Sequence, residues 1–383
     1  MQKFTEDFWV RMNGVSESVN FKMYPIIYHP NQEATKLDFV NLAQKGKYLG
    51  LENKNNIPEG FMKNLNIRLV FHILQKSEVI FLYGLNGAPA LLICLFCRLF
   101  SVRLVLICQF LSPDFEIERR YWIRLLKKIA FQNIEHFITQ SDDTYRTLTE
   151  VYNVKEEQIT QSVFEGGYNL FCDKVAATGE LECNKFNSAE RDVLTYSYVG
   201  NLHPFKGMSE ILKMLQYIED ENLNLPIQIN IAGPSAAVDG EPGSVQYYQK
   251  CLGQISSRIK VNFLGNLSFD DLVSLYRETD VLIHPTQKDC FPKVFIEAFS
   301  FGKPIITSKA HGALGSLIKD NHNAVIFELN NPKSLFECCK LLACDDQYRA
   351  KLGENALIDV KNFCDLKVEK EKMQETLTKM ELT

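Results

Sequence analysis

The sequence lacks a strong excess of charge of either sign. Its 383 residues include 42 lysines and arginines against 47 aspartates and glutamates, which gives a formal net charge of −5. Binding to nucleic acid generally needs concentrated positive charge to displace the counterions of the phosphates, so this balance speaks against it. With 46% hydrophobic residues, the chain is neither disordered nor collagen-like. Its length is typical of two domains, each large enough to bury a core.

Secretory signals need an apolar run, and polar and charged side chains interrupt residues 1–14, so we expect no secretory signal there. The 11 cysteines are odd in number and scattered, which favours reduced thiols in a cytoplasmic compartment over a disulfide framework. Cys94 and Cys97 have metal-ligand spacing, but they stand in an apolar stretch without a second cysteine or histidine pair. Because zinc needs four ligands, we expect these two thiols in a core and predict no metal site.

One uncharged run, residues 79–97, is nearly long enough to span a bilayer. It is interrupted by Gly84, Asn86, Gly87 and Pro89, and proline suits the first turn of a helix because its missing N–H would be unpaired there. We therefore expect a strand, a turn and a helix rather than a membrane span. Residues 102–108 are then predicted to form a second buried strand.

The pattern along the chain predicts two α/β domains and a linker. Polar, aperiodic residues over 173–192 indicate the linker. We predict an N-terminal Rossmann-like domain over residues 1–175, a C-terminal one over 190–365, and a final helix over 366–383 that packs back across the domains. In the second domain, strands are expected at residues 195–199, 227–232, 261–264, 280–284, 304–307 and 324–327, and helices at 208–218, 245–255, 269–277, 293–301 and 332–343. This alternation predicts parallel sheets covered on both faces, which bind ligands at the carboxyl ends of their strands.

Two loops at predicted strand ends carry the candidate chemistry. In the first, Gly200 allows a tight turn and Lys206 places a cation where a helix begins, a combination that suits a phosphate. A solvated loop lysine is the alternative.

The second loop leads through Pro292 into a helix whose first amides, those of Lys293 and Val294, would point out of the helix end. Glu297 follows within the helix, so its carboxylate could face the same site and accept two hydroxyls of a ribose. Asp289 precedes Glu297 by eight residues. The alternatives are a contact with the helix dipole for Glu297 and a loop turn for Asp289.

Taken together, these motifs resemble a known family. The segments Val199-Gly-Asn-Leu with Lys206-Gly207, Ile231-Ala-Gly233, Phe263-Leu-Gly265, Phe291-Pro-Lys-Val-Phe-Ile-Glu297-Ala298 and Gly302-Lys-Pro304 look like the nucleotide-sugar-binding domain of family-4-type glycosyltransferases. The resemblance covers residues 195–355 and continues more faintly over 104–171. It implies the GT-B fold, in which two Rossmann-like doubly wound parallel-sheet domains face a central cleft.

The resemblance also implies roles for the matched positions. Lys206 would contact the donor diphosphate, with Gly200 and Asn201 beside it. Glu297 would bind the ribose, and Asp289 would stand near the transferred sugar. The sugar and the β-phosphate would be held by the backbone of Phe291, Pro292, Lys293 and Val294. A cation and helix amides can stabilise a departing diphosphate, and the absence of any Asp-x-Asp from the sequence removes the usual metal-binding alternative.

Several positions depart from the pattern of the family. The first acid is Asp289 rather than glutamate, Asn201 stands where many members have an arginine, and Gln109 where many have a histidine. Glutamine cannot act as a general base, which leaves the departing phosphate or Asp114 to take the acceptor's proton. A turn is the alternative role for Asp114. We expect His284, which closes a strand, to be a core or rim residue.

A basic segment near residues 117–131 interleaves cations with apolar side chains. Arg119, Arg120, Arg124, Lys127 and Lys128 alternate with Tyr121, Trp122, Ile123, Leu125, Leu126 and Ile129. A helix of this kind can lie on an anionic membrane. The alternative, which we favour, packs its apolar face on the sheet and leaves its basic face in water.

These observations predict a cytoplasmic, metal-independent, retaining glycosyltransferase without a further cofactor. It would move a sugar from a UDP- or GDP-sugar to a saccharide or lipid-linked saccharide acceptor, in bacterial surface-glycan synthesis, with peripheral membrane contact left open. One rival is a catalytically silent GT-B protein that binds a partner, which the altered Asn201, Gln109 and Asp289 motivate. A GT-B phosphorylase or sugar-nucleotide epimerase is the other, and the sequence offers neither a pyridoxal phosphate lysine in context nor the additional acids and histidines.

Overall fold

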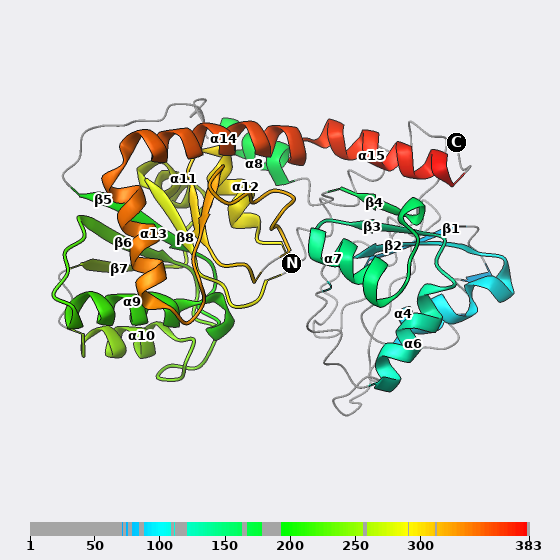
Figure 1. The fold of residues 1–383 in the computed structure, drawn as a ribbon, viewed down its shortest axis with the longest axis horizontal. Coiled ribbons are helices and arrows are strands. Elements are labelled where there is room, and N and C mark those ends of the chain that lie inside the picture. Colours follow the sequence, from blue (N-terminus) through cyan, green and yellow to red (C-terminus); the bar gives the residue numbers. More distant parts are fainter. Residues whose placement is uncertain are drawn as a thin grey trace. The chain divides into compact units, whose positions relative to one another are not determined.

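The computed structural model describes residues 71, 74–75, 79–83, 88–108, 111, 121–162, 167–177, 193–255, 259–289, 291–310 and 312–380. Contacts divide the chain into two compact units: unit 1 combines residues 1–164 with 369–383, and unit 2 comprises residues 165–368. The predicted domains run over 1–175 and 190–365. Each unit contains a parallel sheet flanked by helices (Figure 1). The prediction of two Rossmann-like parallel sheets is confirmed.

Unit 1 is built on a four-stranded parallel sheet in the order β1-β2-β3-β4. The strands are β1 (Val79–Tyr83), β2 (Arg103–Cys108), β3 (His136–Thr139) and β4 (Ile159–Gln161). The helical segments between them are α4 (Ala88–Phe96), η1 (Cys97–Phe100), α6 (Tyr121–Phe131), α7 (Asp142–Arg146), η2 (Thr147–Val151) and η3 (Glu156–Gln158). Residues 79–108 thus form the predicted strand, helix and strand. Among the described residues, no helix combines the length and apolar character that crossing a membrane requires.

The core of unit 1 explains the spacing of its cysteines. Cys94 and Cys97 are both fully buried, together with Leu104 and Phe137. Burial raises the pKa of the Cys94 and Cys97 thiols, so both stay protonated. Their predicted place in a core is confirmed.

The C-terminal helix α15 (Leu366–Lys379) belongs to unit 1 from Glu369 onward. The Thr376 hydroxyl donates to the Thr160 hydroxyl at 3.1 Å, and the Arg103 guanidinium donates to the Met380 carbonyl. Residues 376–380 therefore contact both the start of β2 and strand β4.

Helix α6 differs from the packing that we favoured from the sequence. Its last two residues, Ala130 and Phe131, enter the core, whereas the side chains along its outer face are exposed. Trp122 is 71% exposed, Leu126 43% and Ile129 42%, and these positions share one face at helical spacing. The cations of α6 that the structure describes, Arg124, Lys127 and Lys128, are half-buried. The favoured prediction was therefore wrong, because only the last turn of α6 reaches the core and its apolar stripe points to solvent. Arg119 and Arg120 lie outside the described residues.

Unit 2 is built on a six-stranded parallel sheet in the order β10-β9-β8-β5-β6-β7. The strands are β5 (Leu194–Val199), β6 (Ile227–Ala232), β7 (Lys260–Gly265), β8 (Val281–His284), β9 (Ile305–Thr307) and β10 (Ala324–Ile326). The helical segments are α8 (Gly167–Ala177), η4 (Pro204–Lys206), α9 (Met208–Asp220), α10 (Val245–Leu252), α11 (Phe269–Glu278), α12 (Lys293–Ser300), α13 (Pro332–Cys344) and α14 (Asp346–Cys364). All six predicted strands are present, with ends shifted by one residue at most.

Side chains that alternate along β5 place the helices on both faces of this sheet. The buried Tyr196 hydroxyl donates to the Cys339 carbonyl of α13 at 2.8 Å. The next residue, Ser197, is hydrogen-bonded at 2.6 Å to Thr279, which ends α11. Because successive side chains of a strand point to opposite faces, α13 and α11 cover opposite faces. The sheet is doubly wound, as predicted (Figure 1).

Two helices of unit 2 were not predicted from the sequence. A linker was expected from residue 173, but α8 (Gly167–Ala177) extends to Ala177. Its Phe171 packs edge-on against Tyr276 and Phe301, with ring centres 6.2 and 5.8 Å apart. These aromatic partners come from distant segments, which is why local polarity misled the prediction. Helix α14 was missed as well, although its buried Leu352, Ala356, Val360 and Cys364 recur every four residues.

The strand order of unit 2 creates a topological switch point at β5. From β5 the chain passes to β6 and β7 on one side, and then returns to β8 on the other. The loops that leave the carboxyl ends of β5 and β8 therefore turn in opposite directions. Ligands of doubly wound sheets bind at this position.

Candidate functional site

The loops that follow β5 and β8 are fastened to each other by their backbones. The Gln287 N–H donates to the Phe205 carbonyl at 2.8 Å, and the Thr286 hydroxyl donates to the same oxygen at 3.1 Å. Gly207, which ends η4, has φ +87°, and a Cβ built on it would lie 1.8 Å from the Pro285 carbonyl oxygen. Only glycine fits this close approach, so the Lys206-Gly207 pair of the sequence motif is a packing requirement as well as a chemical one.

A third loop, which follows β9, joins the same cluster. The Asp289 N–H donates to the Ala310 carbonyl at 3.0 Å, and the Ser308 hydroxyl donates to the Thr286 carbonyl. Asp289 is thereby fixed at the carboxyl edge of the sheet, between loops from three strands.

Lys206 and Asp289, the two predicted catalytic residues, are brought together. Their side chains form an ion pair and are 26% and 12% exposed. The same Asp289 oxygen, Oδ2, lies 3.3 Å from Nε2 of His284, the last residue of β8. Burial raises the pKa of Asp289, but the hydrogen bond from His284 and the charge of Lys206 outweigh it and lower the pKa to about 2. Asp289 is therefore ionised at neutral pH.

The predicted turn at Gly200 and Asn201 lies directly after β5. The Gly200 N–H donates to the Ala232 carbonyl at 3.0 Å, and the Asn201 carbonyl accepts from the Tyr198 hydroxyl at 2.8 Å. A Cβ on Gly233 would lie 1.8 Å from the Gly200 carbonyl oxygen, so the loops after β5 and β6 touch. The turn is thus held by its neighbours, and the Asn201 side chain is left exposed.

The start of helix α12 supplies the remaining predicted binding residues. Phe291 and Pro292 are buried, Val294 is half-buried and Lys293 is exposed. Pro292 occupies the N-cap position, where its side chain makes no capping hydrogen bond. A helix start without a side-chain cap presents amide groups and the positive end of the helix dipole, which suits an anion.

Glu297 has a different partner from the Lys206–Asp289 pair. Its Oε2 accepts a hydrogen bond from the Tyr276 hydroxyl of α11 at 2.7 Å. Burial raises the pKa of Glu297, against the opposing effects of the Tyr276 hydrogen bond and of Lys293 and Lys174. The carboxylate is thus held in place on α12 by a buried tyrosine.

Three residues of the site were not identified from the sequence. His284 was expected to be a core or rim residue, and Tyr276 and Glu210 were not singled out. Glu210 is 2% exposed and accepts from the Asn330 N–H at 2.9 Å and from Gln287 at 3.2 Å, which ties α9 to two strand-end loops. The sequence did offer one signal for Glu210, which is its position in the first turn of the helix that follows Gly207.

Some predicted positions lie outside the described residues. These are Gln109 and Asp114.

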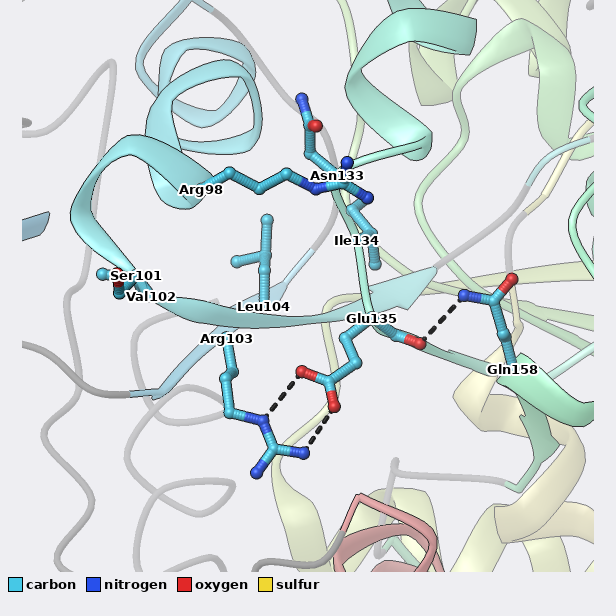
Figure 2. Close-up of a pocket in the computed structure, with 9 residues that line it drawn as sticks. All are labelled: Arg98, Ser101, Val102, Arg103, Leu104, Asn133, Ile134, Glu135 and Gln158. Carbon is cyan, nitrogen blue, oxygen red and sulfur yellow. Dashed lines mark hydrogen bonds and ion pairs between the residues drawn. The ribbon is translucent and has the colours of Figure 1, made fainter.

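Unit 1 contains a polar pocket of about 410 Å³ at the amino-terminal edge of its own sheet, where its strands begin (Figure 2). Arg103 begins β2, and Glu135 and Gln158 precede β3 and β4. Arg103 and Glu135 form an ion pair, and the Gln158 amide donates to the Glu135 carbonyl at 3.2 Å. Because these groups bond to one another and ligands bind at the other edge of such sheets, we interpret the pocket as structural.

Comparison with known proteins finds similarity in the part of the chain that holds the site. Residues 183–358 match the family described as "Glycosyl transferases group 1". A D-inositol 3-phosphate glycosyltransferase of Corynebacterium glutamicum is 25% identical over 167 residues, which are 44% of this chain and 39% of that protein. The capsular polysaccharide biosynthesis glycosyltransferase CapM of Staphylococcus aureus is 22% identical over 238 residues, 62% of this chain and 60% of that protein.

Among solved structures, the Anabaena protein Alr3699/HepE in complex with UDP has a similar fold. The TM-score is 0.62 at 17% sequence identity, and the likeness covers 89% of each chain. At this identity the comparison establishes the fold. The chain spans 39% and 38% of the lengths of the first two curated relatives it matches.

Proposed function

We propose that this protein is a glycosyltransferase, because residues 183–358 match the family described as "Glycosyl transferases group 1" and the chain has the GT-B fold. It moves a sugar from a UDP- or GDP-sugar to a saccharide or lipid-linked saccharide acceptor. The observation that carries the proposal is the Lys206–Asp289 ion pair at the switch point of unit 2. A bound UDP in the structurally similar Anabaena protein supports a nucleotide ligand.

In the proposed mechanism, the departing diphosphate is stabilised without a metal ion. Lys206 gives it a cation, and the uncapped start of α12 gives it amides and a positive dipole end. Both interactions strengthen as negative charge grows on the leaving group, so they favour the transition state over the ground state. Asp289 stands beside the sugar, transfer proceeds with retention, and the leaving phosphate takes the acceptor's proton. No Asp-x-Asp occurs in the sequence to hold a metal for this purpose.

The proposed biological role is surface-glycan synthesis at the cytoplasmic side of a bacterial membrane. The similarity to CapM, a capsular polysaccharide glycosyltransferase, supports it.

A thermal-shift panel of UDP, GDP and their sugars, each in EDTA and in magnesium, tests this function. We expect nucleotides of one base to raise the unfolding temperature equally in both buffers, since a ligand at a hundredfold excess over its Kd stabilises by about 2.7 kcal/mol. Stabilisation that appears only with magnesium would contradict metal independence. No stabilisation by any nucleotide would contradict the function, and binding without sugar transfer would favour the catalytically silent alternative.

We also propose that α6 places unit 1 against an anionic membrane. Its outward face carries Trp122, Leu126 and Ile129, and Arg124 and Lys128 line a pocket beside it together with Glu150. Apolar side chains flanked by cations are what an interfacial helix presents to anionic lipid. A lipid-linked acceptor would then lie in the same membrane.

Replacing Trp122 and Leu126 by alanine is expected to abolish most sedimentation of the protein with phosphatidylserine-containing vesicles. Replacing Arg124, Lys127 and Lys128 by glutamine should weaken it by roughly fivefold per charge, more strongly at low salt, because each cation near such a surface contributes about 1 kcal/mol. Ile358→Ala, which removes a 56% exposed apolar side chain from unit 2, is the control. Equal sedimentation of all variants, or none by the wild type, would favour another role for this face.

A further inference from the structure

His284 is held immobile at the carboxyl end of β8. It is 2% exposed, and its carbonyl accepts from the Thr307 hydroxyl at 2.8 Å. Its ring stacks on Tyr198 with centres 6.2 Å apart, and Phe295 of α12 meets it edge-on at 5.2 Å. With an aromatic ring on the face and another at right angles, the imidazole has a fixed orientation.

The two ring nitrogens of His284 have unequal surroundings. Nε2 lies 3.3 Å from Asp289 Oδ2, whereas Nδ1 is buried without a hydrogen-bond partner among the described residues. Burial lowers the pKa of His284, against the opposing effect of Asp289, so the ring is neutral and carries one N–H.

Hydrogen-bonding assigns that proton to Nε2. A proton on Nδ1 would leave a buried donor without an acceptor and would turn the Nε2 lone pair toward a carboxylate. A proton on Nε2 instead donates to Asp289, and only a lone pair on Nδ1 is left unpaired. A phenylalanine would fill this apolar space without an unpaired nitrogen, so the cost of the histidine points to a use for its N–H.

Asp289 Oδ2 also accepts a hydrogen bond from the ammonium group of Lys206. If Lys206 binds the donor diphosphate, as proposed above, it must share its protons with phosphate oxygens. The hold of Lys206 on Asp289 then weakens at the stage when the sugar is transferred. The N–H of His284 comes from a side chain that is 2% exposed, so it can stay on Asp289 when Lys206 turns to the phosphates.

We propose that His284 is a positioning residue, which holds the Asp289 carboxylate in its catalytic orientation while Lys206 is engaged by the diphosphate. This role deepens the proposed glycosyl transfer and rests on it. The loop that carries Asp289 is fixed by its backbone through the Ala310 carbonyl, and His284 fixes the end of the side chain.

The contact itself is tested without any substrate. In protein labelled with ¹⁵N only in histidine, long-range ¹H–¹⁵N spectra distinguish a protonated from an unprotonated ring nitrogen. We expect His284 to be neutral with the proton on Nε2, and Asp289→Asn to shift the Nε2 resonance. A proton on Nδ1, or no response to Asp289→Asn, would overturn the proposal whether or not the protein binds nucleotides.

The role in transfer is tested with two matched variants. His284→Gln keeps an N–H donor, and His284→Phe keeps the ring between Tyr198 and Phe295. With the nucleotide sugar that the thermal-shift panel selects, we expect His284→Phe to lower kcat by about 10-fold or more, while KM and the Kd for UDP or GDP stay within about threefold. His284→Gln should recover most of kcat.

Two outcomes would overturn the positioning role. One is a wild-type kcat in His284→Phe, and the other is an equal loss in both variants that follows their unfolding temperatures. If the wild type binds no nucleotide at all, the proposed function fails by itself, and the ¹⁵N spectra still decide the contact between His284 and Asp289.

Discussion

Replacing Lys206 by alanine is expected to weaken the binding of UDP or GDP by about 10- to 150-fold and to leave the binding of the nucleoside unchanged. A hydrogen bond to a charged group contributes about 1.5–3 kcal/mol, which corresponds to this range. The loss should be compounded by Asp289, because its carboxylate would then face the phosphates without the cation that now pairs with it. Transfer should slow further, since charge on the leaving group grows toward the transition state.

Glu297→Ala is expected to have the complementary effect, weakening nucleoside and nucleotide by similar factors if the carboxylate binds the ribose. Tyr276→Phe is its control, because it removes the 2.7 Å hydrogen bond to Glu297 and leaves the carboxylate itself. Lys250 is an exposed lysine on α10, and Lys250→Ala therefore controls for the loss of one positive charge. Calorimetric titration with nucleoside, nucleoside diphosphate and nucleotide sugar separates these cases.

Equal and small effects of Lys206→Ala and Glu297→Ala on every ligand would mean that neither side chain lines the binding site. The roles that the family resemblance implies would then fail at its two best-matched positions. A selective loss of phosphate binding in Lys206→Ala alone would support the diphosphate site and reassign Glu297 to a structural contact with Tyr276.

Gly207→Ala is expected to destabilise unit 2 by about 4 kcal/mol or more, a loss seen only with a few drastic mechanisms. Gly240→Ala is the matched control: the two glycines have φ values of +87° and +88°, and a Cβ at Gly240 meets nothing within 4 Å. Gly240→Ala should lower the free energy of unfolding by only about 1–2 kcal/mol, the cost of a left-handed conformation at a residue with a Cβ. The difference between the variants measures the clash with the Pro285 carbonyl, which lies 1.8 Å from the built Cβ.

Hydrogen exchange of the β5 and β8 amides in urea reports on unit 2 separately from unit 1. Gly207→Ala should also weaken nucleotide binding, since a displaced η4 moves Lys206 away from Asp289. Equal exchange in the two variants would mean that the loops after β5 and β8 can separate at little cost. In that case their backbone hydrogen bonds do not determine the geometry of the site.

The strands of unit 2 could be predicted closely because each is a short apolar run between turn residues, and its burial on both faces leaves a local signature. The prediction failed where the partners of a segment are distant in sequence. From the sequence, Phe171 marks the end of the first domain, whereas in the structure it packs against Phe301 and Tyr276 of unit 2. In α6, apolar and basic residues alternate whether the apolar stripe is buried or exposed, so periodicity alone could not decide which side faces water.

By itself, the sequence determined the fold class, the positions of the two strand-end loops, and which cation and which acid each of them carries. These features depend on local composition and on motif spacing. Only the tertiary structure decided the order of the six strands, which puts the loops after β5 and β8 at one switch point. It also decided that Asp289 contacts both Lys206 and His284, and that Glu297 contacts Tyr276. Such contacts join residues from different strands and helices, and their distances follow from how the whole sheet is assembled rather than from any one segment.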